Sequence, residues 1–74
     1  MDHVIDLTIC VDNAAFGDTY AEQAEELARI FRVLADRLEA SPYYLDPTSG
    51  VLLSLYDGNG NRVGSLTPSV LALG

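Results

Sequence analysis

Apolar and polar residues alternate at the start of the chain, over residues 3–11. The odd positions from Ile5 to Val11 are all apolar, whereas the even positions include Asp6, Thr8 and Cys10. A period of two that is rich in β-branched side chains is typical of a strand with one buried face. We therefore expect a strand whose apolar face meets the core and whose other face meets water or a partner.

A longer period follows over residues 20–40 and predicts an amphipathic helix. Thr19 and Glu22 have the spacing of a capping box, Asp18 is the alternative cap, and Pro42 disfavours helical geometry in the residue before it. The charged residues lie on one side, which is expected to face solvent. The side chains expected to face the sheet recur every three or four positions: Tyr20, Ala24, Leu27, Phe31, Leu34 and Leu38, flanked by Ala28, Ala35 and Ile30.

Two further strands are predicted over residues 51–56 and 62–67, and the Gly- and Asn-rich residues 57–61 form a hairpin turn between them. The order β–α–β–β predicts a single α+β domain over residues 1–74. One amphipathic helix packs on one face of a three-stranded mixed or antiparallel sheet. The long connection makes the first two strands parallel, and the third strand lies either between them or at an edge.

This arrangement leaves the second face of the sheet uncovered, and such a face commonly becomes an interface. The side chains expected on it are Val4, Cys10, Leu52 and Tyr56. Residues 68–74 form a short apolar tail that either packs down or frays.

Composition narrows the classes of function. The chain has 74 residues and a net charge of −7, from 11 acidic residues against four arginines and no lysine. This balance disfavours direct binding to nucleic acid or to an anionic membrane, and it favours a basic protein surface as partner. The same charge also serves to keep a small domain soluble, and that alternative remains open.

No catalytic or metal-binding pattern emerges from the residues. Cys10 is the only cysteine, so no disulfide forms within the chain, and with His3 it cannot supply four zinc ligands. The run from Asp57 to Asn61 resembles the start of a calcium loop, but Arg62 stands where that loop needs glycine. We expect no cofactor and no enzymatic activity. Since no apolar run approaches the roughly 20 residues that span a bilayer, a cytoplasmic location is expected.

The candidate functional residues are therefore those suited to binding another protein. The acidic ones cluster near the predicted junction between the first strand and the helix, where they either mimic nucleic-acid phosphates or form a solvated face. The two apolar residues of the set have polar neighbours. The set comprises Asp12, Asp18, Glu22, Glu25, Glu26, Val33 and Tyr56.

Three segments carry a resemblance to a group of small bacteriophage and prophage accessory proteins: a DNAAF turn at residues 12–16, an ELARIFRVLADRL helix segment at residues 26–38 and a DGNGNRVG hairpin at residues 57–64. No functional residues carry over from this group. By size, charge and origin the resemblance implies an inhibitor of a host nucleic-acid-handling defence complex, similar to anti-CRISPR proteins. The alternative is a homodimerising structural or regulatory domain, joined through the open sheet face, without inhibitor activity.

Overall fold

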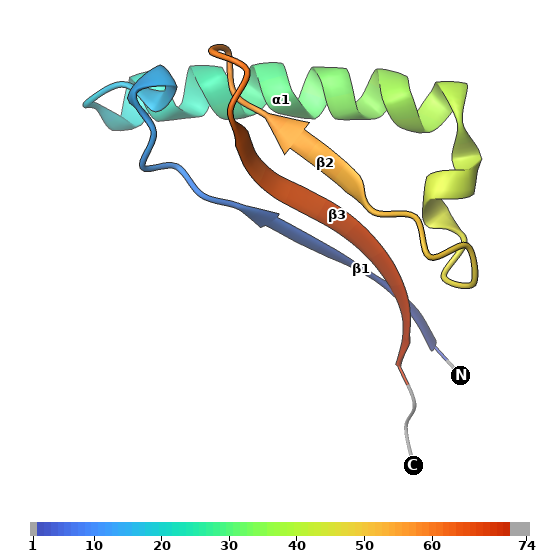
Figure 1. The fold of residues 1–74 in the computed structure, drawn as a ribbon. Helices are drawn as coiled ribbons and strands as arrows, with labels where there is room; N and C mark the ends of the chain where they lie inside the picture. Colours follow the sequence, from blue (N-terminus) through green and yellow to red (C-terminus); the bar gives the residue numbers. More distant parts are fainter. Residues whose placement is uncertain (1, 72–74) are drawn as a thin grey trace.

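The computed structural model describes residues 2–71 and has one long helix lying across a three-stranded antiparallel sheet (Figure 1). The α+β class predicted from the sequence is confirmed. Two short 3-10 helices flank the long helix. In chain order the elements are β1 (Asp2–Ile9), η1 (Ala14–Phe16), α1 (Tyr20–Ala40), η2 (Pro42–Leu45), β2 (Leu53–Tyr56) and β3 (Arg62–Leu71).

The third strand lies between the other two, in the order β1-β3-β2, and it is antiparallel to both. β1 and β2 therefore run parallel to each other without pairing, which settles the alternative left open by the sequence. Leu66 lies opposite both Leu7 and Leu53, so these three side chains share the sheet face that carries the helix.

β2 carries a bulge between Leu55 and Tyr56, and on its other side β3 approaches β1 closely at Gly64. A Cβ atom at position 64 would lie 1.9 Å from the carbonyl oxygen of Thr8, so only glycine fits there.

The helix begins and ends where its sequence predicts. Thr19 is the N-cap, and its hydroxyl accepts a hydrogen bond from the backbone N–H of Glu22. The Glu22 carboxylate accepts a bond from the same hydroxyl instead of completing a capping box at the Thr19 backbone N–H.

The buried side of the helix is rotated away from the predicted stripe. Ile30, predicted as a flanking residue, is 2% exposed, whereas Phe31, predicted at the centre of the stripe, is 45% exposed. Tyr20 is 89% exposed. The rotation brings the side of α1 that carries Arg29 and Arg37 against the outer edge of β2, where both arginines form hydrogen bonds. The prediction that these two arginines face open solvent was wrong.

The core lies where α1, η1, β2 and β3 meet. Phe16 anchors η1 in it and is fully buried. The buried apolar side chains are Phe16, Ile30, Leu34, Leu53, Leu55, Val63 and Leu66. Among residues 3–9 of β1, none belongs to this group.

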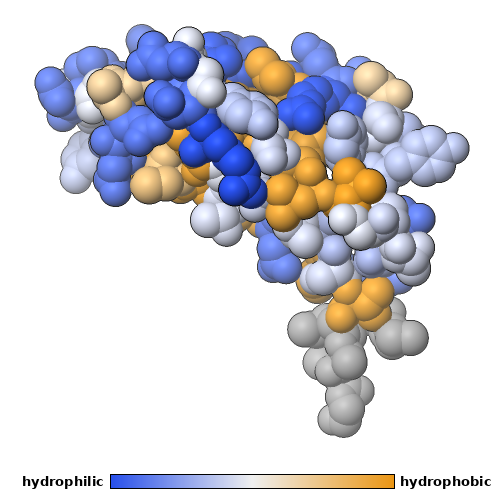
Figure 2. All heavy atoms as spheres, viewed as in Figure 1, coloured by the Kyte–Doolittle hydropathy of each residue, from blue (hydrophilic) through white to orange (hydrophobic). Residues whose placement is uncertain are grey.

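β1 is more exposed than its alternation predicts. Ile5 and Leu7 point to the helix side of the sheet, yet they are 48% and 43% exposed, because β1 is the strand farthest from α1 (Figure 1). The prediction that this face of β1 meets the core was wrong for both residues. In Figure 2, hydrophilic side chains cover the N-terminal half of α1, and apolar ones gather over the strands below its C-terminal half.

Two strand boundaries also differ from the prediction. β2 begins at Leu53 and leaves Leu52 in the preceding loop. β3 continues through Leu71, so the segment predicted as a tail is strand as far as that residue, and residues 72–74 lie outside the described part. The sheet face away from the helix carries Val4 as predicted, among hydroxyl groups of Thr8, Ser54, Ser65, Thr67 and Ser69. The bulge interrupts the alternation at Tyr56, which lines a hollow beside α1.

Candidate functional site

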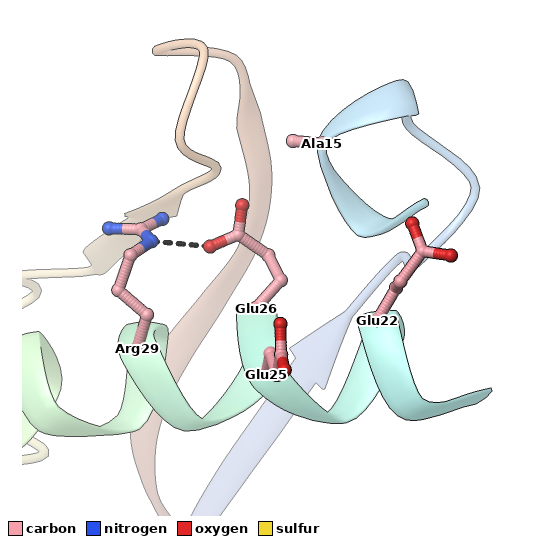
Figure 3. Close-up of a pocket in the computed structure, with 5 residues that line it drawn as sticks. All are labelled: Ala15, Glu22, Glu25, Glu26 and Arg29. Atoms are coloured by element: carbon pink, nitrogen blue, oxygen red, sulfur yellow. Dashed lines mark hydrogen bonds and ion pairs between the residues drawn. The ribbon is translucent and has the colours of Figure 1, made fainter. Parts of the chain in front are cut away.

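An open hollow of about 300 Å³ lies between η1 and the first turns of α1. Its lining brings together three of the predicted binding residues, Glu22, Glu25 and Glu26, with Ala15 and Arg29 (Figure 3). Gly17, with φ +70°, ends η1, and a side chain there would collide with Glu22. The tight turn that this glycine permits holds η1 beside the helix.

The three carboxylates of this hollow differ in how far contacts within the chain engage them. Glu26 forms an ion pair with Arg29, accepts a hydrogen bond of 3.1 Å from the backbone N–H of Gly58, and its side chain is 9% exposed. It therefore ties the helix to the hairpin and is not free to meet a partner. Glu22 and Glu25 are exposed, and Glu22 keeps one carboxylate oxygen free of the Thr19 hydroxyl.

Arg29 pairs with Glu26 and not with Glu25, which the sequence placed four residues before it. The only cation lining the hollow is thus neutralised, and Glu22 and Glu25 give the hollow its net negative charge. We name Glu22, Glu25 and the hollow beside them the acidic face.

Asp57 is the buried carboxylate of the described region, with 4% of its surface exposed. It accepts hydrogen bonds from the side chain of Asn13 at 3.0 Å and from the backbone N–H groups of Asn59 and Asn61, both at 2.9 Å. Burial raises the pKa of the Asp57 carboxyl, but the bonds from Asn13, Asn61 and Asn59 outweigh it and hold the pKa below 3.8. The carboxylate joins the turn before η1 to the hairpin and serves structure.

This network also explains the run that resembles a calcium loop. Asn59 and Asn61 direct N–H groups at Asp57 and close the hairpin around it, whereas a calcium loop would gather oxygen atoms around an ion. Within residues 2–71 no group of three side chains has the arrangement needed to hold a metal ion.

A second, smaller hollow of about 120 Å³ lies between α1 and the outer edge of β2. It brings together Val33 and Tyr56, the two apolar residues predicted for binding, which are 46% and 49% exposed. Arg29 and Arg37 line the same hollow. Their guanidinium groups donate to the backbone carbonyls of Tyr56 at 3.2 Å and Ser54 at 2.8 Å.

These two arginines were not among the residues predicted for binding, although they line this hollow. They lie eight residues apart, about 12 Å along the helix axis. The hydrophobic pattern placed both among the charged residues of the solvent side, so it contained no signal of their contacts with β2. Arg37 also lies over the ring of Tyr44, 5.7 Å from the ring centre, and so ties the end of α1 to η2.

The remaining predicted residues, Asp12 and Asp18, lie on either side of η1. Both are exposed, and neither lines the hollow beside Glu22. Asp12 accepts a long contact of 3.6 Å from the Cys10 thiol. The structure thus divides the predicted binding residues between two hollows and the loop around η1.

No helix among residues 2–71 combines the length and apolar character needed to cross a membrane. Comparison of the chain with protein-family models, with curated proteins and with solved structures gives no match.

Proposed function

We propose that this chain acts by binding a basic surface of another protein through its acidic face. The observation that carries the proposal is the pairing of Arg29 with Glu26, which leaves Glu22 and Glu25 as the exposed charges beside the hollow. An uncompensated pair of carboxylates next to a concave surface favours a protruding cation such as arginine or lysine.

The partner class we propose is a nucleic-acid-handling complex of a bacterial host. Surfaces that bind phosphates are rich in lysine and arginine, so carboxylates presented on a small rigid helix compete for them. The resemblance to small phage accessory proteins supports this partner, and with it a role as an inhibitor of a host defence complex in the host cytoplasm. The net charge of −7 opposes direct binding of the chain to nucleic acid.

Long-range attraction between opposite charges raises the association rate more than it slows dissociation. We therefore expect binding to weaken steeply as salt is added, and the loss to lie mainly in the association rate. Reversal of two charges at the edge of the interface should lower that rate by about tenfold or more at low ionic strength.

The test compares two double variants of equal net charge. E22K/E25K alters the acidic face, and D36K/E39K alters two exposed acids near the other end of the same helix. Each variant changes the net charge from −7 to −3 (−7 + 4). Circular dichroism and thermal denaturation establish that both remain folded. Each protein is then expressed in bacteria that carry a nuclease-based defence complex, and phage plating efficiency is measured.

The proposal predicts that the unaltered chain and D36K/E39K restore phage plating and that E22K/E25K does not. Equal loss in both variants would mean that net charge alone matters, which would contradict a localised acidic face. Failure of the unaltered chain against every defence complex tested would refute the inhibitor role. In that case surface plasmon resonance would test the binding mode by itself. A salt-sensitive interaction of the chain with a basic protein would support binding through the acidic face even though the inhibitor role had been refuted.

A further inference from the structure

The edges of the sheet are protected to very different degrees. At the outer edge of β2, the guanidinium groups of Arg37 and Arg29 occupy the backbone carbonyls of Ser54 and Tyr56. These are the groups that another strand would need in order to pair with β2. Side chains from α1 therefore close this edge.

The edge of β3 that extends past β2 is closed by proline. β2 pairs with β3 only as far as Leu53, opposite Leu66, so the following residues of β3 have no strand partner on that side, although η2 contacts β3. Cys10 and Val63 form a hydrogen-bonded pair, and such pairs recur at every second residue along an antiparallel ladder. Thr67 and Ser69 therefore direct their backbone groups at β1. The backbone nitrogen of Pro68, which lies between them, is directed at the side that has no strand partner. It carries no hydrogen and therefore cannot donate to another strand.

β1 has no such protection. The backbone N–H of Cys10 donates to Val63 at 2.7 Å, so the even residues of β1 are the ones that bond to β3. By alternation, the N–H and C=O groups of Ile5, Leu7 and Ile9 are directed at the open edge. Within the described strand there is neither proline nor bulge on this edge, and the carboxylate of Asp6 accepts a bond of 3.3 Å from Ser69, a residue of β3.

We propose that this edge of β1 pairs with the β1 strand of a second copy of the chain, antiparallel and centred on Leu7. In that register Leu7 lies opposite its own copy, Ile5 lies opposite Ile9, and Asp6 lies opposite Thr8, whose hydroxyl is able to donate to the carboxylate. The three pairs are thus apolar with apolar or acceptor with donor, which is the pairing that stabilises a sheet.

The neighbouring registers are less favourable. Centring on Asp6 would still let Ile5 and Leu7 form the backbone hydrogen bonds, but it would place two carboxylates directly opposite each other in a closely spaced pair. Centring on Ile5 would oppose Leu7 to His3 and Asp6 to Val4. A shift by one residue would oppose Leu7 to Asp6 and Ile5 to Thr8, and would mix apolar with polar side chains on both faces.

In the proposed dimer the two three-stranded sheets join into one of six strands (3 + 3), with both helices on the same face. Leu7 of one copy then lies beside Leu7 of the other, and Ile5 lies beside Ile9, which explains why Ile5 and Leu7 are apolar although no helix covers them. The acidic face on α1 stays free, so the dimer neither requires nor excludes the proposed function.

The first test uses cysteine cross-linking of the full chain in a C10S background. Leu7 and its copy would form a hydrogen-bonded pair with Cα atoms about 5.5 Å apart, within the range of a disulfide. We expect L7C to form a covalent dimer under mild oxidation. The matched control is I5C, equally half-exposed on the same strand, because the two copies of residue 5 would lie about 14 Å apart (four residues at about 3.4 Å). Equal cross-linking at both positions would overturn the register.

The second test is sedimentation equilibrium of the full chain and of two charge variants, L7K and L7E. Because residue 7 meets its own copy, each variant should dimerise at least tenfold more weakly than the unaltered chain, and a 1:1 mixture should recover the dimer. Since each copy carries −7, added salt should strengthen the dimer, opposite to its effect on a basic partner. An unaltered chain that remains monomeric at millimolar concentration in 0.5 M salt would overturn the proposal, as would no recovery on mixing.

Discussion

Two adjacent helix residues, Ile30 and Phe31, give the sharpest test of how α1 sits on the sheet. A regular amphipathic pattern makes Phe31 the larger contributor to the core. In the structure Ile30 is 2% exposed and Phe31 is 45% exposed. Truncation of each residue to alanine therefore distinguishes the observed rotation of the helix from the predicted one.

The expected magnitudes differ by a factor of two or more. Truncation of a fully buried isoleucine removes its transfer free energy and leaves a cavity, at a cost of about 2 to 5 kcal/mol. Phe31 is about half exposed, so F31A should cost only about 1 kcal/mol, roughly half the value of a fully buried side chain and with no cavity. A domain of 74 residues has a free energy of unfolding of about 4 to 11 kcal/mol, so I30A removes a large share of it.

Urea denaturation followed by circular dichroism gives both free energies of unfolding. In thermal denaturation, a loss of about 3 kcal/mol should lower the Tm of I30A by 12 °C or more, against about 4 to 8 °C for F31A. An F31A variant that is destabilised as much as I30A, or more, would refute the observed orientation of α1.

Three further predictions concern the contacts that join the elements. D57N should lower the free energy of unfolding at neutral pH. Because the folded pKa of Asp57 lies below its ordinary value, the difference in unfolding free energy from the unaltered chain should shrink as pH falls from that ordinary value through the lower folded pKa, as measured by urea denaturation. R37A should lose about 1 to 2 kcal/mol and increase light scattering, since it uncovers the Ser54 carbonyl and the Tyr44 ring. G64A should separate β1 from β3 and lower Tm by more than 10 °C, whereas G60A, in an open turn, should cost less.

The elements of the fold could be predicted from the sequence because their signals are local. Thr19 caps the helix and Pro42 follows its end, so α1 has the bounds that the pattern indicates. The Gly- and Asn-rich turn likewise predicts the hairpin between β2 and β3. Such signals depend on backbone chemistry within a few residues, which the sequence states directly.

The orientation of the elements depends on contacts between distant residues, and these the sequence does not state. The rotation of α1 follows from Arg29 and Arg37 reaching the carbonyls of β2, at separations of 27 and 17 residues. In the same way, Glu26 was predicted as a free binding residue, but the backbone N–H of Gly58, 32 residues away, holds its carboxylate. Glu22 and Glu25 are exposed, as a binding role requires, whereas the carboxylate of Glu26 is held by contacts within the chain.

The central claim is that α1 covers β2 and β3 but leaves the outer edge of β1 bare, and hydrogen exchange at single residues tests it most directly. In a dilute sample at low salt, the amides of Ile5 and Leu7 should exchange at least tenfold faster than those of Asp6 and Thr8, and added salt and protein should slow them. Equal protection of all four amides in the dilute sample would contradict the claim.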